Sequence, residues 1–137
     1  MNAKEYLRQL SRDEATLKAK KKHLEVLRDT VSYVAAHKLD GMPRSSSNEG
    51  SSVERSVEKM ADLEAEITQD EAALNLKKAQ ALDLIEKLDN PECKTILVLR
   101  YFRHMSWSEI AERMFYTERW VYKLHGFALR ELDEILE

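Results

Sequence analysis

The sequence predicts an all-α protein in which a long antiparallel helical hairpin, similar to a coiled coil, precedes a compact domain of three helices. Three observations support this prediction. The 137 residues include only three glycines and two prolines, while 34% are charged and 7% are aromatic, a balance that favours long solvated helices over a sheet with many turns. Apolar residues recur at every seventh position through most of the first two thirds. Helix-capping patterns then divide the last third into shorter helices.

The first predicted helix covers residues 1–39. An apolar residue recurs there at intervals of seven, at Leu10, Leu17, Leu24 and Val31. This interval places the residues on one stripe of a helix. Because such a stripe would otherwise face water, it requires a partner helix, and we predict that this segment is one arm of a hairpin.

A polar segment, residues 40–52, separates the two predicted arms. Gly41 suits the end of a helix, Pro43 cannot continue one, and a run of serines follows, so we expect a flexible Ser-rich loop. The second arm covers residues 53–90. It keeps the interval of seven at Val53, Met60, Ile67, Leu74, Ala81 and Leu88. These repeats are compatible with two arrangements. The two arms can pair within one chain, or they can pair between two chains of a homodimer.

Charge is distributed unevenly along the chain. Residues 1–52 contain 10 basic and 7 acidic side chains, residues 53–90 contain 5 and 10, and residues 91–137 contain 7 and 8. The net charge of −3 is unlike the overall basic character that is usual in nucleic-acid-binding proteins. Any contact with DNA must therefore come from local patches.

A basic cluster lies in the first arm, at Lys18, Lys20, Lys21 and Lys22. Acidic side chains of the second arm are available to it at Glu64, Glu66, Asp70 and Glu71. Opposite charges on two helices select their pairing, although each exposed pair contributes only a few tenths of a kcal/mol. We expect the lysines to form a solvated or interhelical face, and the alternative is a phosphate-binding patch.

The third part of the chain covers residues 91–137. Pro91 suits the first turn of a helix, with Asn90 or Asp89 as its cap. The expected apolar stripe of this helix consists of Ile96, Leu97, Leu99 and Phe102.

Two further helices follow. Ser106, with Glu109 three residues later, has the spacing of a capping box and predicts a short helix that begins at Trp107. Thr117 is a suitable N-cap for the next helix, and Glu118 favours its positive N-terminal end. The inner stripe of that helix is expected at Val121, Leu124, Ala128, Leu129, Leu132 and Leu136. Two helices in this order form a helix-turn-helix, whose second helix can enter the major groove of DNA.

The helix-turn-helix sequence resembles a known family. The pattern Glu109-Ile-Ala-Glu112 is followed by Thr117, Val121, Leu124, Ala128 and Leu129, and it is preceded by Ile96-Leu-Val-Leu-Arg100. At these residues the chain resembles region 4 of the sigma-70 family, which recognises the upstream promoter element. It is also similar to the C-terminal part of small phage and prophage proteins of the sigma-like or late-transcription-regulator type.

The resemblance covers about residues 91–132 and implies a set of DNA contacts. Base edges or phosphates would be contacted near Glu118, Arg119, Tyr122 and Lys123, with Thr117 at the backbone. Arg and Lys side chains are chemically suited to guanine edges or phosphates.

Three aromatic residues are unusual for this family. Tyr122 stands where the family often has a basic residue, and Trp120 is expected either to pack against the hairpin or to contact DNA. Phe115 occupies a turn position where the family commonly has glycine, so we expect a different turn or some backbone strain there.

The function expected from this resemblance is that of a phage-encoded transcription regulator, which reads duplex DNA with the second helix of its C-terminal helix-turn-helix. RNA polymerase is a further candidate partner. Two alternatives stay open. One is a protein-interaction module that binds RNA polymerase or a sigma-directed partner with weak or no DNA binding, and the other is a structural DNA-packaging subunit.

No motif in the sequence points to an enzyme, a cofactor or a metal site. The four histidines are scattered, and neither a phosphate-binding glycine loop nor a nucleophile elbow is present. Cys93 is the only cysteine and lies in an apolar helical pattern, which predicts a buried structural thiol. Without a signal-peptide pattern or the apolar run of about 20 residues that a membrane span needs, we expect a cytoplasmic protein with no membrane contact.

Overall fold

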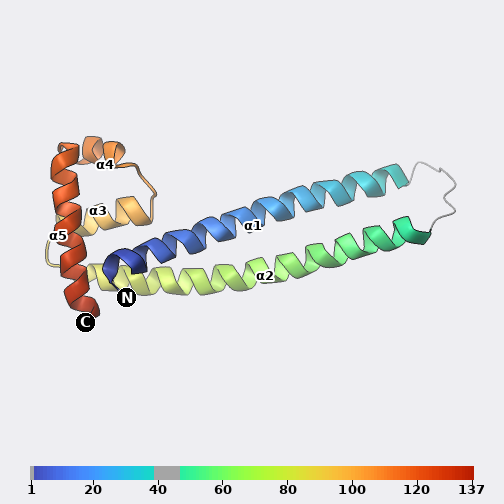
Figure 1. Cartoon of the computed structure of the whole chain (residues 1–137), viewed down its shortest axis with the longest axis horizontal. Coiled ribbons are helices and arrows are strands. Elements are labelled where there is room, and N and C mark those ends of the chain that lie inside the picture. Colours follow the sequence, from blue (N-terminus) through green and yellow to red (C-terminus); the bar gives the residue numbers. More distant parts are fainter. Residues whose placement is uncertain (1, 39–46) are drawn as a thin grey trace. The chain divides into compact units, whose positions relative to one another are not determined.

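The computed structural model describes residues 2–38 and 47–137. Figure 1 labels the helices of this described part, which contains no strand. They are α1 (Ala3–Lys38), α2 (Ser47–Glu86), α3 (Pro91–Tyr101), α4 (Trp107–Met114) and α5 (Glu118–Leu136). The predicted all-α class, with two long helices before three shorter ones, is confirmed.

Both ends of α2 differ from the prediction. The helix begins at Ser47, so residues 47–52, which we expected in the loop, are helical. Serine favours helix N-termini as well as loops, which explains why the sequence pattern did not separate the two. The remaining expected loop, including Gly41 and Pro43, lies outside the described residues. At its other end α2 stops at Glu86, because the chain turns before the cap of α3.

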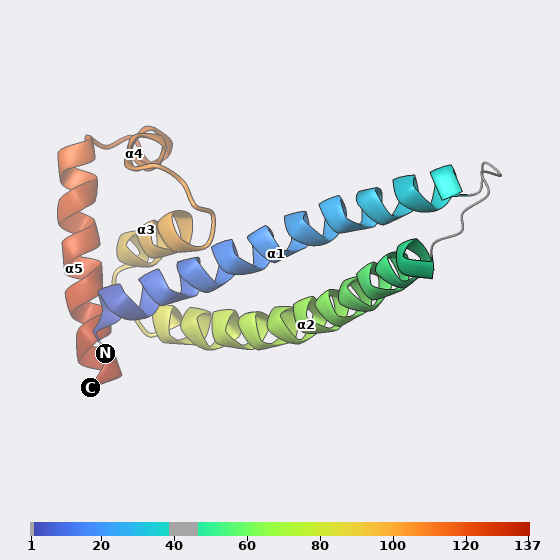
Figure 2. The same cartoon turned by 45° about the vertical axis from the view of Figure 1, so that its right-hand side comes forward.

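The described helices form two compact units. One contains residues 15–73, and the other contains residues 1–14 together with 74–137. In the unit of residues 15–73, the segments of α1 and α2 lie side by side (Figure 2). They are antiparallel, because Lys21 pairs with Glu71 whereas Arg28, further along α1, pairs with Glu64.

As predicted, part of the basic cluster of α1 faces acidic side chains of α2. The Nζ atom of Lys20 lies 2.9 Å from a carboxylate oxygen of Glu66 and also binds Asp70. The hydrogen bonds that Lys20 donates, first to Asp70 and then to Glu66, raise the pKa of Lys20 above its ordinary value. Lys18 and Lys22 are exposed, and neither forms an ion pair with a carboxylate of the described residues.

In the other unit, the first turns of α1 share a core with α3 and α5. The buried residues of this core are Ala3, Leu7, Ile85, Leu88, Cys93, Leu97, Tyr101, Ala128 and Leu132. Each fully buried Leu or Ile of this kind contributes about 1.5–3 kcal/mol to folding. The start of α1 therefore packs with the C-terminal helices, although its sequence pattern continues without a break into the hairpin arm.

Polar contacts hold the N-terminus of α1 in this core. The backbone N–H of Ala3 donates to Oδ1 of Asp133 in α5 at 2.6 Å. The side chain of Asn2 accepts a hydrogen bond from the N–H of Glu5 at 2.8 Å, which satisfies one of the free donors of the first helical turn.

A second core joins α3, α4 and α5. Its buried residues are Ile96, Leu99, Ile110, Ala111, Val121 and Leu124. Every residue of the apolar stripes predicted on α3 and α5 is buried or half-buried. Figure 2 shows α4 beside the N-terminal end of α5, and this packing fixes which face of that end remains exposed.

Candidate nucleic-acid interface

Three side-chain caps define the N-terminal ends of the short helices. Asn90 caps α3 by accepting from the N–H of Glu92 at 2.9 Å. Ser106 caps α4 by accepting from the N–H of Glu109 at 3.2 Å. The Ser106 hydroxyl in turn donates to the carboxylate of Glu109 at 3.1 Å. Thr117 caps α5 by accepting from the N–H of Trp120 at 3.2 Å. All three predicted caps are confirmed.

The turn between α4 and α5 contains Phe115 in a left-handed conformation, with φ 59° and ψ 40°. Its N–H closes α4 by donating to the carbonyl groups of Ala111 and Glu112. Of the two outcomes expected for this aromatic residue, backbone strain is therefore the one observed. An L-residue pays on the order of 1–2 kcal/mol for this conformation, and glycine does not.

The first turns of α5 expose all the residues that the sequence predicted as DNA contacts: Thr117, Glu118, Arg119, Tyr122 and Lys123. Arg119, Tyr122 and Lys123 are spaced three and four residues apart, so they share one helix face. Val121 and Leu124 are buried on the opposite side. The helix is thus anchored by one face and presents two cations and a phenol on the other.

Exposed aromatic rings lie in the turn before α5 and in its first turn. Phe115 is 93% exposed and Trp120 is 40% exposed. The Trp120 ring lies 6.4 Å from that of Tyr116 in an edge-on arrangement.

Next to the exposed face lies a concave surface of about 710 Å³, which we call the basic depression. Its lining comes from α1, α3, α4, α5 and the segment before α4, all within the unit of residues 1–14 and 74–137. The lining residues are Lys4, Arg8, Ser11, Arg12, Arg100, Tyr101, His104, Trp107, Tyr122 and His125. Four of them are Lys or Arg and none is Asp or Glu.

Arg100 is held in place within the basic depression. Its guanidinium lies over the Trp107 ring, 4.4 Å from the centroid, and its Nη1 donates to the carbonyl of Met105 at 2.9 Å. The Trp107 ring in turn contacts the rings of Tyr122 and His125, with centroids 5.1 and 4.6 Å away. This packing fixes a cation beside an aromatic wall.

His125 lies in the lining of the basic depression, beside its cations. Burial lowers the pKa of this imidazole to about 4, and the charges of Arg100, Lys4 and Arg8 act in the same direction. The ring is consequently neutral at pH 7, where its Nε2 is hydrogen-bonded to the Tyr101 hydroxyl at 2.9 Å. His125 therefore adds no positive charge to the depression at this pH.

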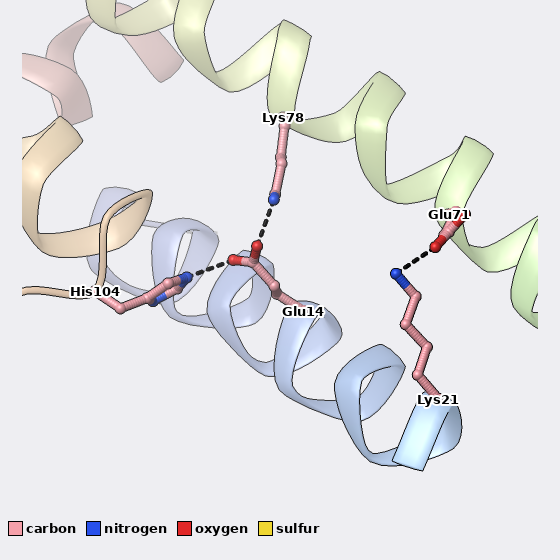
Figure 3. Close-up of polar contacts among 5 residues, drawn as sticks. All are labelled: Glu14, Lys21, Glu71, Lys78 and His104. Carbon is pink, nitrogen blue, oxygen red and sulfur yellow. Dashed lines mark hydrogen bonds and ion pairs between the residues drawn. The ribbon is translucent and has the colours of Figure 1, made fainter. Parts of the chain in front are cut away.

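At the edge of the depression, Glu14 joins three segments (Figure 3). One carboxylate oxygen binds Nζ of Lys78 in α2, and the other binds Nε2 of His104. Burial of the carboxyl acts to raise the pKa of Glu14, but the hydrogen bonds from Lys78 and His104 outweigh it and lower the pKa. The carboxylate is thus already engaged and leaves the cations of the depression uncompensated.

The exposed face of α5 was predicted from the sequence, whereas the basic depression was not. Lys4, Arg8 and Arg12 follow one another at intervals of four, which places them on one face of a helix. This spacing could have predicted a basic face on α1. The position of Arg100 beside that face depends on the tertiary fold and could not be predicted from local sequence.

The remaining chemistry of the described residues is limited. Cys93 is 1% exposed, and its Sγ lies 3.8 Å from the carbonyl oxygen of Leu124. Burial raises the pKa of this thiol, as expected of a structural cysteine. In residues 2–38 and 47–137, no three His, Cys, Asp or Glu side chains are grouped as metal ligands. None of the described helices combines the length and apolarity needed to cross a membrane.

Comparison of the chain with protein-family models, with curated proteins and with solved structures finds no match.

Proposed function

We propose that the protein is a DNA-binding transcription regulator that reads duplex DNA with the first turns of α5. The main support is the exposed face of Arg119, Tyr122 and Lys123 on a helix whose other face is buried. Arg can bind a guanine edge with two hydrogen bonds, and Lys can bind a guanine edge or a phosphate. The short helix α4, packed against the start of α5, would then cross the DNA backbone. The resemblance to region 4 of the sigma-70 family supports the same placement.

The charge distribution sets an expectation for affinity. The whole chain carries a net charge of −3, so its overall charge does not attract DNA. The attraction must come from local groups of cations. Binding should therefore be modest and should weaken steeply with salt.

Selection of binding sites from a random duplex library tests the proposal. We expect an enriched sequence, and Arg119→Ala should relax preference at one base position by about 1–3 kcal/mol. Lys59 of α2 is exposed and lies in the other unit, so Lys59→Ala is a control that removes the same charge. The absence of any enriched sequence would contradict the proposal, as would equal effects of the two substitutions.

The exposed aromatic residues favour a second candidate, a protein-interaction module that binds RNA polymerase. Phe115 and Trp120 project from the turn and from the start of α5, and aromatic side chains are enriched at the centres of protein interfaces. Titration of purified RNA polymerase with wild type and with Phe115→Ser separates the two candidates. Loss of polymerase binding, with DNA binding unchanged, would favour the interaction module.

A further inference from the structure

We propose that the basic depression clamps the phosphodiester backbone of the DNA duplex whose groove α5 enters. The inference rests on the proposed function and assigns a role to Lys4, Arg8 and Arg12 at the opposite end of the sequence. Tyr122 connects the two surfaces, because it belongs to the exposed face of α5 and also lines the depression. A duplex on that face would have its backbone beside the α1 cations.

The cations of the depression lack counter-charges. Lys4, Arg8, Arg12 and Arg100 form no ion pair with any carboxylate in the described part of the chain. Glu14, which touches the lining at His104, is bound by Lys78 as well. In a protein whose net charge is −3, a group of unpaired cations on a concave surface is suited to an anionic ligand.

The spacing of the cations suits a linear polyanion. Four residues of α-helix advance by about 6 Å, so the stripe from Lys4 to Arg12 is about 12 Å long. Each strand of a DNA duplex carries one charge for every ~3.4 Å of the axis. The stripe is therefore long enough to contact several consecutive phosphates, whereas a single small anion would use only part of it.

Arg100 adds a cation that is already ordered. Its guanidinium is fixed by the Trp107 ring and by the carbonyl of Met105, so little side-chain freedom remains to be lost on binding. The Ser11 hydroxyl, between Arg8 and Arg12 in the lining, supplies a further hydrogen-bond donor. Phosphate contacts of this kind position a protein on the duplex without reading its sequence.

The salt dependence of binding by the full-length chain tests the clamp. The variant combines Lys4→Gln, Arg8→Gln and Arg12→Gln, three exposed positions whose replacement leaves the buried core intact. Each lost phosphate contact should reduce the slope of log affinity against log salt by about 0.9, so the triple variant should have a slope shallower by about 2–3. Affinity for selected and for random duplexes should fall by the same factor, since base contacts are retained.

The matched control combines Lys18→Gln and Lys22→Gln, which remove exposed and unpaired charges from the same helix. The control should keep the wild-type slope. An unchanged slope in the triple variant would overturn the clamp, and so would an equal reduction per charge in the control.

The same measurements distinguish failure of the clamp from failure of the proposed function. If wild type selects a sequence but the triple variant keeps the wild-type slope, the clamp is wrong and the regulator stands. If wild type binds duplexes without preference and the triple variant has the shallower slope, the clamp stands and sequence reading is wrong. A wild-type protein that binds no duplex would overturn both.

Discussion

Replacement of Phe115 by glycine should stabilise the protein relative to replacement by alanine. At φ 59° and ψ 40°, an L-residue is disfavoured by about 1–2 kcal/mol, and alanine retains this strain. Glycine removes the strain but loses about 0.5–1 kcal/mol through the larger freedom of the unfolded chain. The Gly variant should therefore be more stable than the Ala variant by about 0.5–1 kcal/mol.

The Ala variant also measures how much the aromatic ring contributes to folding. The Phe115 side chain is 93% exposed, so its removal takes little apolar surface out of the core. With about 25 cal/mol for each Å² of apolar surface, the expected cost is below about 0.5 kcal/mol. Relative to wild type, the Gly variant should accordingly be equal in stability or slightly more stable.

Urea unfolding followed by far-ultraviolet circular dichroism measures these differences. The midpoints should shift while the slope of free energy against urea stays constant, since the exposed surface of the unfolded state is unchanged. In thermal unfolding, the Gly and Ala variants should differ by about 2–5 °C. A Gly variant no more stable than the Ala variant would refute the assignment of strain to this turn, and a loss above about 1 kcal/mol in the Ala variant would show that the ring packs in solution.

Three further predictions concern the same unit. Gly126→Ala should stabilise α5 by about 1 kcal/mol, because an added Cβ would meet only Nη2 of Arg130, at 4.0 Å; a lower thermal midpoint would show that this position needs glycine. Ser106→Ala should cost about 1 kcal/mol through loss of the α4 cap, and an unchanged urea midpoint would contradict that role. The pKa of His125 is about 4 in the folded protein, against its ordinary value of 6.5. At pH values between 4 and 6.5 the unfolded chain therefore binds more protons than the folded chain, so the stability should fall as the pH is lowered from about 6.5 to 4. His125→Gln should remove about 1–2 kcal/mol of that fall, after allowance for the partial exposure of the ring, and an identical pH profile from urea unfolding would refute the burial effect.

Elements determined by nearby residues were predictable from the sequence. The caps at Asn90, Ser106 and Thr117 each involve a donor two or three residues away, so the local pattern already contains the interaction. The inner stripe of α5 was predictable for the same reason, because helical periodicity alone determines which positions share a face.

Features that depend on distant residues were not predictable in this way. The hydrogen bond from Ala3 to Asp133 joins residues 130 positions apart. Moreover, Ala3, Leu10 and Leu17 continue a single interval of seven, so periodicity gives no sign that the first turns of α1 pack with α5. The early start of α2 at Ser47 was missed for another reason, since serine is equally suitable for a loop and for a helix N-terminus.

Gly126 lies inside α5, where a glycine can permit either the close approach of another segment or a bend of the helix. The space beside its Cα is open except for the Arg130 side chain at 4.0 Å, so close approach does not explain the glycine.

The burial of Ala3 and Leu7 determines where the α1 cations lie. Both residues are fully buried in the core that contains Ala128 and Leu132, and this fixes the rotation of the helix about its axis. Lys4 and Arg8 each follow a buried residue by one position, about 100° around the helix, so they must emerge at the edge of that core. There they line the basic depression beside Tyr122. If the proposed function is correct, the same apolar contacts that complete the core also position the charges that hold the DNA backbone, and loss of those contacts should weaken DNA binding and folding together.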